Sequence, residues 1–133
     1  MTTIPKPQGV NAYLTNKKYD NILKVLPATM ERVEIIFLQA GDGMLKIEYG
    51  FNERMYIPDS MRINAVDELL QKKKIKGVIE TVPTLRANQV WFDPTVLNIN
   101  KLIDEITEIE DNLPPVADLV LHSRQVRLPI AFE

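Results

Sequence analysis

The sequence contains one pattern twice: two short apolar segments, a tight connection, and then a helical segment with one apolar face. The first copy runs from Val33 to about Lys74, and the second runs from Gly77 to about Asn112. Two ββα units most simply form one four-stranded antiparallel sheet with both helices on one face, which is an α+β architecture of two layers. Because one unit alone could not cover its apolar sheet face, we expect the two units to share a core.

The first repeat begins with a predicted hairpin. Val33 to Leu38 is rich in β-branched and aromatic residues, and Met44 to Tyr49 alternates apolar and polar residues. Between them lies Gly41-Asp42-Gly43, and an Asp-Gly pair favours a hairpin turn because both positions tolerate positive φ. A phosphate-binding loop is the alternative, but no helix follows these residues and the Gly-x-x-x-x-Gly-Lys pattern is absent. We therefore favour the turn.

A helix is expected after this hairpin. Pro58-Asp59-Ser60 provides a stop and then a side chain able to cap free amides. Lys72 to Lys74 would end the helix, where cations suit the negative end of the dipole. With Lys76 they could form a phosphate-binding patch, but no aromatic residues are interleaved, so we interpret them as a solvated helix end. The inward stripe is Ile63, Val66, Leu69 and Leu70.

The second repeat has two predicted strands, Gly77 to Val82 and Ala87 to Phe92, and a helix that Asn98 can cap. The stripe of this helix follows the i, i+3, i+4, i+7 rule more closely than any other segment. Its members are Ile99, Leu102, Ile103, Ile106 and Ile109. We expect the acidic residues to form its solvent-exposed face: Asp104, Glu105, Glu108, Glu110 and Asp111.

These patterns divide the chain into three parts. Residues 1–32 are a predicted lead-in, residues 33–113 a ββαββα domain, and residues 114–133 a linker followed by one extra strand. Within the lead-in, Ala12 to Leu26 is compatible with short helical turns.

The extra strand is Val126 to Phe132, whose residues alternate as in a half-buried strand, although Pro129 restricts it to an edge or a bulge. An apolar strand without a partner is an aggregation hazard. We infer that the chain is a piece of a longer protein, cut where a further β-rich domain begins. The alternative is that this strand folds back onto the edge of the sheet.

Composition narrows the classes of function. The 133 residues include 16 basic and 18 acidic side chains, which gives no reason to expect nucleic acid or an anionic membrane as a partner. The absence of cysteine excludes disulfides, thiolate metal sites and cysteine nucleophiles. No signal-peptide pattern and no apolar run long enough for a membrane span occur, so a cytoplasmic protein is the default expectation. His122 is the only histidine and has no neighbours at metal-ligand spacing, so we predict no metal site.

Arg86 is the candidate binding residue. It lies in the short link between the strands of the second repeat, where its guanidinium could hold a carboxylate or a carbonyl. The alternative is an exposed arginine that pairs with Asp93 or a glutamate. Trp91 is expected in the core or in an interface. The residues alone identify no catalytic group.

Four segments, in order, resemble a known family. Gly41 to Gly50 resembles the hairpin GD-x-x-L-x-(V/I)-E-(F/Y)-G of the carboxyltransferase family that includes subunit 1 of allophanate hydrolase. Ile75 to Arg86 resembles its segment GV(V/I)-(D/E)-x-x-P-x-x-R, and Phe92 to Pro94 resembles its strand end (Y/F)-D-P. Ser123 to Glu133 is similar to the first strand of the family's second domain, particularly in urea carboxylase and urea amidolyase.

The resemblance implies an N-terminal α+β domain followed by a cyclophilin-like β-barrel domain. In urea carboxylase such a pair transfers a carboxyl group from carboxybiotin to urea, giving allophanate. The chain would hold the first domain and one strand of the second, and the cyclophilin-like domain and the biotin carrier domain would be its partners. Biotin would be carried by another domain, and the isolated chain would have little or no turnover.

Two further implications concern the binding residue and the alternative function. Arg86 matches the arginine of the family pattern and would contact a carboxylate or carbonyl, while Ala87 replaces a frequent serine and so removes a hydroxyl contact. Relatives also include one of the subunits of 5-oxoprolinase and a bacterial sporulation-kinase inhibitor. A regulatory module that binds a protein is therefore the alternative function.

Overall fold

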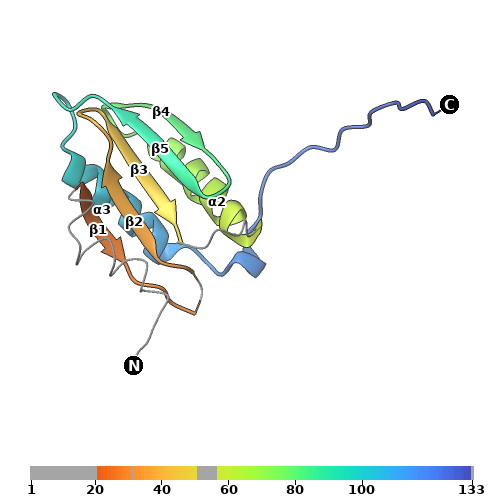
Figure 1. The fold of residues 1–133 in the computed structure, drawn as a ribbon, viewed down its shortest axis with the longest axis horizontal. Helices are drawn as coiled ribbons and strands as arrows, with labels where there is room; N and C mark the ends of the chain where they lie inside the picture. Colours follow the sequence, from red (N-terminus) through yellow and green to blue (C-terminus); the bar gives the residue numbers. More distant parts are fainter. Residues whose placement is uncertain (1–20, 31, 51–56, 133) are drawn as a thin grey trace.

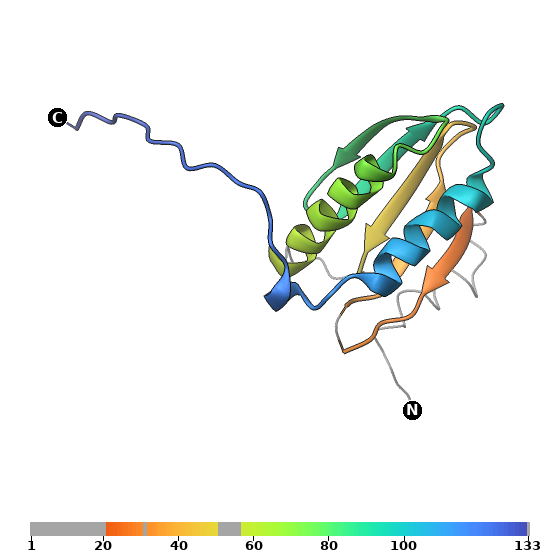
Figure 2. The same cartoon turned by 180° about the vertical axis from the view of Figure 1, so that it is seen from behind.

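A computed structural model describes residues 21–30, 32–50 and 57–132. The described strands form one antiparallel sheet with the order β1-β2-β3-β5-β4 (Figure 1). Both long helices lie against the same face of this sheet (Figure 2). The α+β class is thus confirmed, although the sheet has five strands where four were expected. The elements are β1 (Ile22–Leu26), β2 (Ile35–Gln39), β3 (Met44–Tyr49), α2 (Ile57–Lys73), β4 (Val78–Pro83), β5 (Ala87–Phe92), α3 (Ile99–Asn112) and a short 3₁₀ helix, η1 (Val116–Asp118).

The two repeats meet in the interior of the sheet. Strand β3 of the first repeat pairs with β5 of the second, so that Leu45 lies opposite Val90 and Ile47 opposite Asn88. Side chains on the helix-facing side of these strands pack against α2 and α3 in one continuous core. The shared core expected from the repeat pattern is confirmed. Its fully buried members include Ile35, Phe37, Leu45, Ile47, Ile63, Val66, Val90, Leu102 and Ile106.

The fifth strand, β1, corrects one prediction. Short helical turns were expected over Ala12 to Leu26, but residues 22–26 form a strand that pairs antiparallel with β2. Val25 lies opposite Ile36, and Leu26 lies opposite Ile35 and joins the core. Hydrogen bonds to a neighbouring strand and burial against it override a weak helical period. The part of the predicted segment before residue 21 lies outside the described residues.

The hairpin of the first repeat forms as predicted. Strands β2 and β3 pair antiparallel, and the amide of Ala40 donates to the carbonyl of Met44 over 3.0 Å. Gly41 has a φ of +82°, a conformation that costs glycine little. The prediction of a turn at Gly41-Asp42-Gly43 is therefore confirmed, although the positive φ falls on Gly41 and not on the Asp42-Gly43 pair from which the turn was predicted.

The caps of the two helices differ from each other. Asn98 caps α3 as predicted, because its side chain accepts a hydrogen bond from the amide of Asn100 over 2.8 Å. Helix α2 already begins at Ile57, so the prediction that Asp59 or Ser60 caps it is wrong, and both lie in its first turn. Pro58 is tolerated there because the first amides of a helix have no intrahelical acceptor.

The apolar stripes of the helices are largely as predicted. In α3 every predicted position except the half-buried Ile99 is buried, and in α2 the side chains of Ile63, Val66 and Leu70 are buried. Leu69 differs, since it remains 40% exposed and lines a cleft between the two helices. Glu110 also differs, because it is 1% exposed and so does not belong to the solvent-exposed face predicted for α3.

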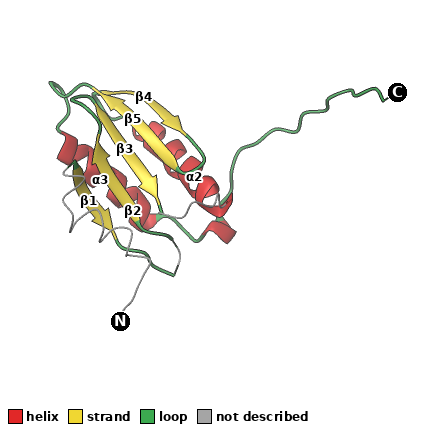
Figure 3. Cartoon of the chain, viewed as in Figure 1, coloured by secondary structure: helices red, strands yellow, loops and turns green. Residues whose placement is uncertain are grey.

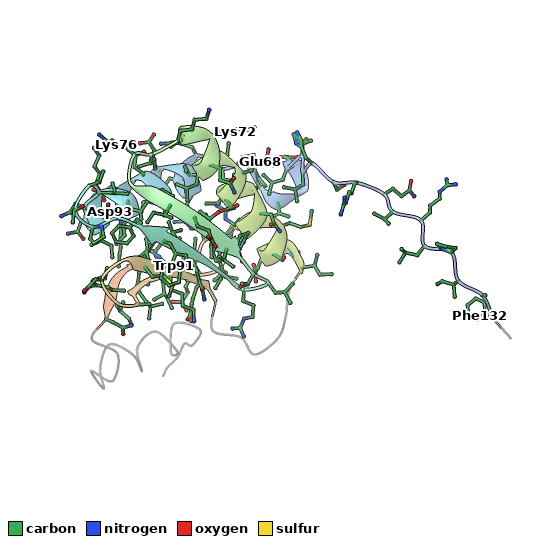
Figure 4. All side chains as sticks on the ribbon, turned by 90° about the horizontal axis from the view of Figure 1, so that it is seen from above. Glu68, Lys72, Lys76, Trp91, Asp93 and Phe132 are labelled. Atoms are coloured by element: carbon green, nitrogen blue, oxygen red, sulfur yellow. The ribbon has the colours of Figure 1, made fainter. Side chains whose placement is uncertain are left out.

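The C-terminal segment runs away from the domain in an extended form. Within the described residues no strand is formed after η1, and Figure 3 shows this segment as loop throughout. The apolar side chains of Val126, Leu128, Ile130 and Phe132 are exposed, and Phe132 lies near the far end of the segment (Figure 4). The assignment of residues 114–133 to a linker and the first strand of another domain stays a prediction.

Candidate functional site

Charged side chains gather at one end of the two-layer domain formed by the sheet and the two helices. Strand β3 ends here, α2 begins, α3 ends, and the β4–β5 turn lies beside them. The amide of Tyr49 at the end of β3 donates to the carbonyl of Arg86 in that turn over 2.9 Å, which joins the two repeats at this end. The predicted binding residue is thus held on a backbone anchored in the sheet.

A buried ion pair connects the two helices at this end. Arg62 Nε donates to Glu110 Oε1 over 2.8 Å, and Arg62 Nη2 donates to the backbone carbonyl of Glu110 over 3.0 Å. The hydroxyl of Tyr49 donates to Glu110 Oε2. Burial, and then the charge of Glu110, raise the pKa of Tyr49 well above its ordinary value. Both carboxylate oxygens of Glu110 therefore accept hydrogen bonds from buried side chains, so Glu110 is not available as a general base.

A second buried network ties α2 to β5. Asn88 Nδ2 donates to Asp67 Oδ1 over 3.1 Å, and Gln71 Nε2 donates to Asp67 Oδ2 over 2.7 Å. Asp67 and Asn88 are both buried. The Asp67 carboxylate is therefore satisfied by amide donors, and we assign it a structural role.

A cleft of ≈ 370 Å³ opens beside the Arg62–Glu110 pair. It lies between the β1–β2 connection, the first turn of α2 and η1, and its lining includes Arg32, Asp59 and Arg62. Partial burial raises the pKa of the Asp59 carboxyl, and the positive charges of Arg86 and Arg62 oppose this shift. Three arginines thus act on one end of the domain.

Two guanidinium groups in the lining of this cleft keep unused donors. Arg32 Nη1 pairs with Asp111 Oδ1 over 3.2 Å, but Arg32 Nε and Arg62 Nη1 are buried and have no acceptor among the described residues. A buried donor left unpaired costs about 1–3 kcal/mol. Neither Arg32 nor Arg62 was singled out from the sequence. The fold places both of them in the lining of this cleft.

Arg86 occupies a half-buried position in the β4–β5 turn. Within the described part of the chain its guanidinium has no ion-pair partner, and its charge acts on Asp59. The alternative pairing with Asp93 does not occur. Asp93 follows the other end of β5, where its Oδ1 accepts from the amide and the hydroxyl of Thr95 over 2.9 and 2.6 Å. These hydrogen bonds lower the pKa of Asp93.

The other singled-out residues lie elsewhere. His122 is exposed on the C-terminal segment, with its Nδ1 3.6 Å from Glu68 Oε1 on α2, beside a second, open cleft of ≈ 720 Å³. Trp91 is 44% exposed, and the alternation of β5 places it on the sheet face opposite the helices. Trp91 is therefore not in the core, and its place in an interface stays a prediction.

Two absences are observed among the described residues. No three histidine, cysteine, aspartate or glutamate side chains are grouped so that they could hold a metal ion. In the same residues, no helix has the length and apolar character needed to cross a membrane.

Comparisons with known proteins agree with this architecture. The family profile "Carboxyltransferase domain, subdomain C and D" matches residues 35–133. Urea amidolyase of Saccharomyces cerevisiae is 31% identical over 111 residues, which cover 80% of this chain. The crystal structure of Kluyveromyces lactis urea carboxylase superposes with a TM-score of 0.65 at 24% identity over 71% of this chain. An uncharacterised protein of Pyrococcus horikoshii, PH0987, superposes with a TM-score of 0.50 at 18% identity over 57% of the chain.

The chain belongs to the carboxyltransferase domain family, subdomains C and D. It spans only 6% of the yeast urea amidolyase and 8% of the Kluyveromyces lactis urea carboxylase. It therefore corresponds to a small region of these large proteins.

Proposed function

We propose that the chain is the N-terminal part of a carboxyltransferase region that transfers a carboxyl group from carboxybiotin to urea. One observation carries this proposal: the family match is continuous from residue 35 to residue 133 and so includes both repeats and the C-terminal segment. The 31% identity to yeast urea amidolyase favours urea as the acceptor. Such a protein would act in the cytoplasm.

In that reaction this chain would position the reactants and would not itself perform the chemistry. Both buried carboxylates of the helices, Asp67 and Glu110, are consumed by internal hydrogen bonds. Biotin would arrive on a separate carrier domain, and residues 114–133 would lead into a cyclophilin-like domain. Holding two reactants in place is worth several powers of ten in rate. The isolated chain is therefore expected to show little or no turnover.

Arg86 is the residue that we propose to contact the substrate. Its turn is fixed by the Tyr49–Arg86 backbone hydrogen bond, while its guanidinium has no ion-pair partner in the described part of the chain. A fork of N–H donors matches the two oxygens of a carboxylate or a single carbonyl oxygen.

The test is urea-dependent carboxylation by the complete protein that contains this chain. We expect incorporation of labelled bicarbonate into allophanate, a large loss in the Arg86→Gln variant, and no change in Lys101→Gln, which removes an exposed charge on α3. Absence of any urea-dependent product from the complete protein would refute the function. Turnover by the 133-residue chain with free carboxybiotin would refute the positioning role alone.

A regulatory module that binds a protein is the second candidate. The observation in its favour is that the region matched in the Pyrococcus horikoshii protein makes up 34% of that chain, so the fold also occurs outside very large proteins. A protein kinase or an oxoprolinase component would be the partner by resemblance. Inhibition of a sensor kinase by the purified 133-residue chain, without biotin, would favour this candidate over the enzyme.

A further inference from the structure

The cleft between the β1–β2 connection, α2 and η1 combines features that point to a ligand. Arg62 is 3% exposed and belongs to the lining, and its Nη1 has no acceptor in the part of the chain that the structure describes. Arg32, whose side chain is 10% exposed, belongs to the same lining, and its Nε likewise finds no acceptor within residues 21–30, 32–50 and 57–132. Two independent guanidinium groups thus keep a buried donor beside the same cavity.

We propose that this cleft binds a small-molecule carboxylate through Arg32 and Arg62. A carboxylate supplies several acceptor positions, and its hydrogen bonds with guanidinium N–H groups are charge-assisted. The ion pairs with Glu110 and Asp111 hold the two guanidinium groups in place, so little side-chain entropy is lost on binding. This site is independent of the proposed carboxyl transfer, and either can fail without the other.

The size and walls of the cleft favour a small organic acid. Its ≈ 370 Å³ lie at the lower end of the range for ligand pockets, roughly 300–1,000 Å³. Val33, Pro115 and Val116 give the lining an apolar part, suited to the body of such a ligand. Both free donors have almost no exposed surface in this structure, so a ligand can reach them only if the lining of the cleft rearranges locally.

The negative charge of Asp59 should weaken the binding of a carboxylate, so a substitution at this position tests the proposal directly. Asp59 belongs to the lining of the same cleft, where its negative charge would repel a second carboxylate. Replacing it with asparagine keeps the shape and removes the repulsion. A variant that binds more tightly cannot be explained by loss of folding.

The experiment is a titration of the isotope-labelled 133-residue chain with sodium benzoate, followed by backbone amide chemical shifts. Benzamide, the neutral molecule of nearly the same shape, is the matched ligand control. We expect saturable shifts at Arg32, Asp59 and Ala117 with benzoate at about millimolar concentration, and none with benzamide. Arg32→Gln should weaken binding about tenfold, as expected for one charge-assisted hydrogen bond. Asp59→Asn should tighten it, and Lys101→Gln should leave it unchanged.

The outcomes separate clearly. Saturation by benzoate at these amides, with opposite effects of Arg32→Gln and Asp59→Asn, supports the site. No saturable shift, equal shifts with benzamide, or a benzoate affinity unaffected by both variants overturns it. Thermal unfolding tests whether Arg32→Gln is folded. If it is not, the benzoate affinity of Asp59→Asn alone decides whether the proposed site is supported.

Discussion

Arg62 near the start of α2 and Glu110 near the end of α3 form an ion pair that solvent barely reaches, with side-chain exposures of 3% and 0%. The pair fixes the separation of the helices at the end where the cleft lined by Arg32 and Arg62 opens. Because the second carboxylate oxygen of Glu110 accepts from Tyr49, the same group also ties the helices to the sheet. One carboxylate therefore positions three elements around the candidate site.

Removing one partner of this pair should destabilise the domain strongly. We expect Glu110→Ala to lower the free energy of unfolding by about 3–5 kcal/mol, because it leaves the Arg62 charge buried and uncompensated. The double variant Arg62→Met, Glu110→Leu should lose much less, since both charges are gone. Urea denaturation measures both. The exposed pair Lys72–Glu68 is the control, and Lys72→Gln should cost less than about 0.5 kcal/mol. A mild effect of Glu110→Ala would contradict the buried network.

Tyr49 should make stability fall at alkaline pH. Its pKa in the folded state lies well above the unfolded value near 10. The unfolded chain therefore loses this proton first, so stability is complete below about pH 10 and decreases as the pH rises further. In Tyr49→Phe this part of the alkaline decrease should vanish, while stability at pH 7 falls by about 1–3 kcal/mol through the unpaired Glu110 oxygen. Denaturant midpoints between pH 7 and 11 measure both effects, and parallel pH profiles of the two proteins would refute the assignment.

Gly77 should tolerate no side chain. Its φ is +103°, and an added Cβ would lie 2.7 Å from Leu97 Cβ and 3.3 Å from Val96 Cγ1. Gly77→Ala should therefore cost about 2–4 kcal/mol, from backbone strain and overpacking together. Gly41 is the matched control, since it has a φ of +82° but no atom within 4 Å of the added Cβ. Gly41→Ala should cost only about 1–2 kcal/mol, as strain alone. Equal losses in thermal unfolding would show that the Leu97 contact is unimportant.

The extended C-terminal segment should contribute to association and not to folding. Removal of residues 124–133 deletes four large exposed apolar side chains and no residue of the core. We expect an unchanged melting temperature and less concentration-dependent self-association in light scattering, because unpaired apolar strands promote aggregation. A drop in melting temperature would instead show that the segment packs on the domain.

The sequence pattern was sufficient for the parts of the fold that depend on local chemistry. The period of α3, the Asn98 cap and the Gly41-Asp42-Gly43 turn are each encoded within a few residues, and the structure has all three. Strand β1 was missed because its place depends on a distant partner, β2, and on the burial of Leu26 against the core. A short segment with a mixed pattern carries no local sign of that pairing.

The candidate site was harder to predict for the same reason. Glu110 was assigned to the solvent-exposed face because it is acidic, although it lies four residues after Ile106 and seven after Ile103, in line with the buried stripe. Arg62 likewise precedes Val66 by four residues. A charged residue in line with an apolar stripe on each of two helices is the signal that predicts such a pair. Arg86 was singled out because it lies in the short link between two predicted strands and also matches a family pattern, and its role stays a prediction. Arg32 has no such sequence signal and is identified by the cleft alone.

The pairing of β3 with β5 has a consequence for handling the protein. Since the two ββα halves share this ladder in the interior of the sheet, a cut at the turn before Gly77 would leave each half with a bare edge and half a core. Neither fragment would fold alone, but together they present matching surfaces. Fused to two test proteins that bind each other, the fragments would be brought together and would reassemble more readily, so this domain could serve as a split reporter.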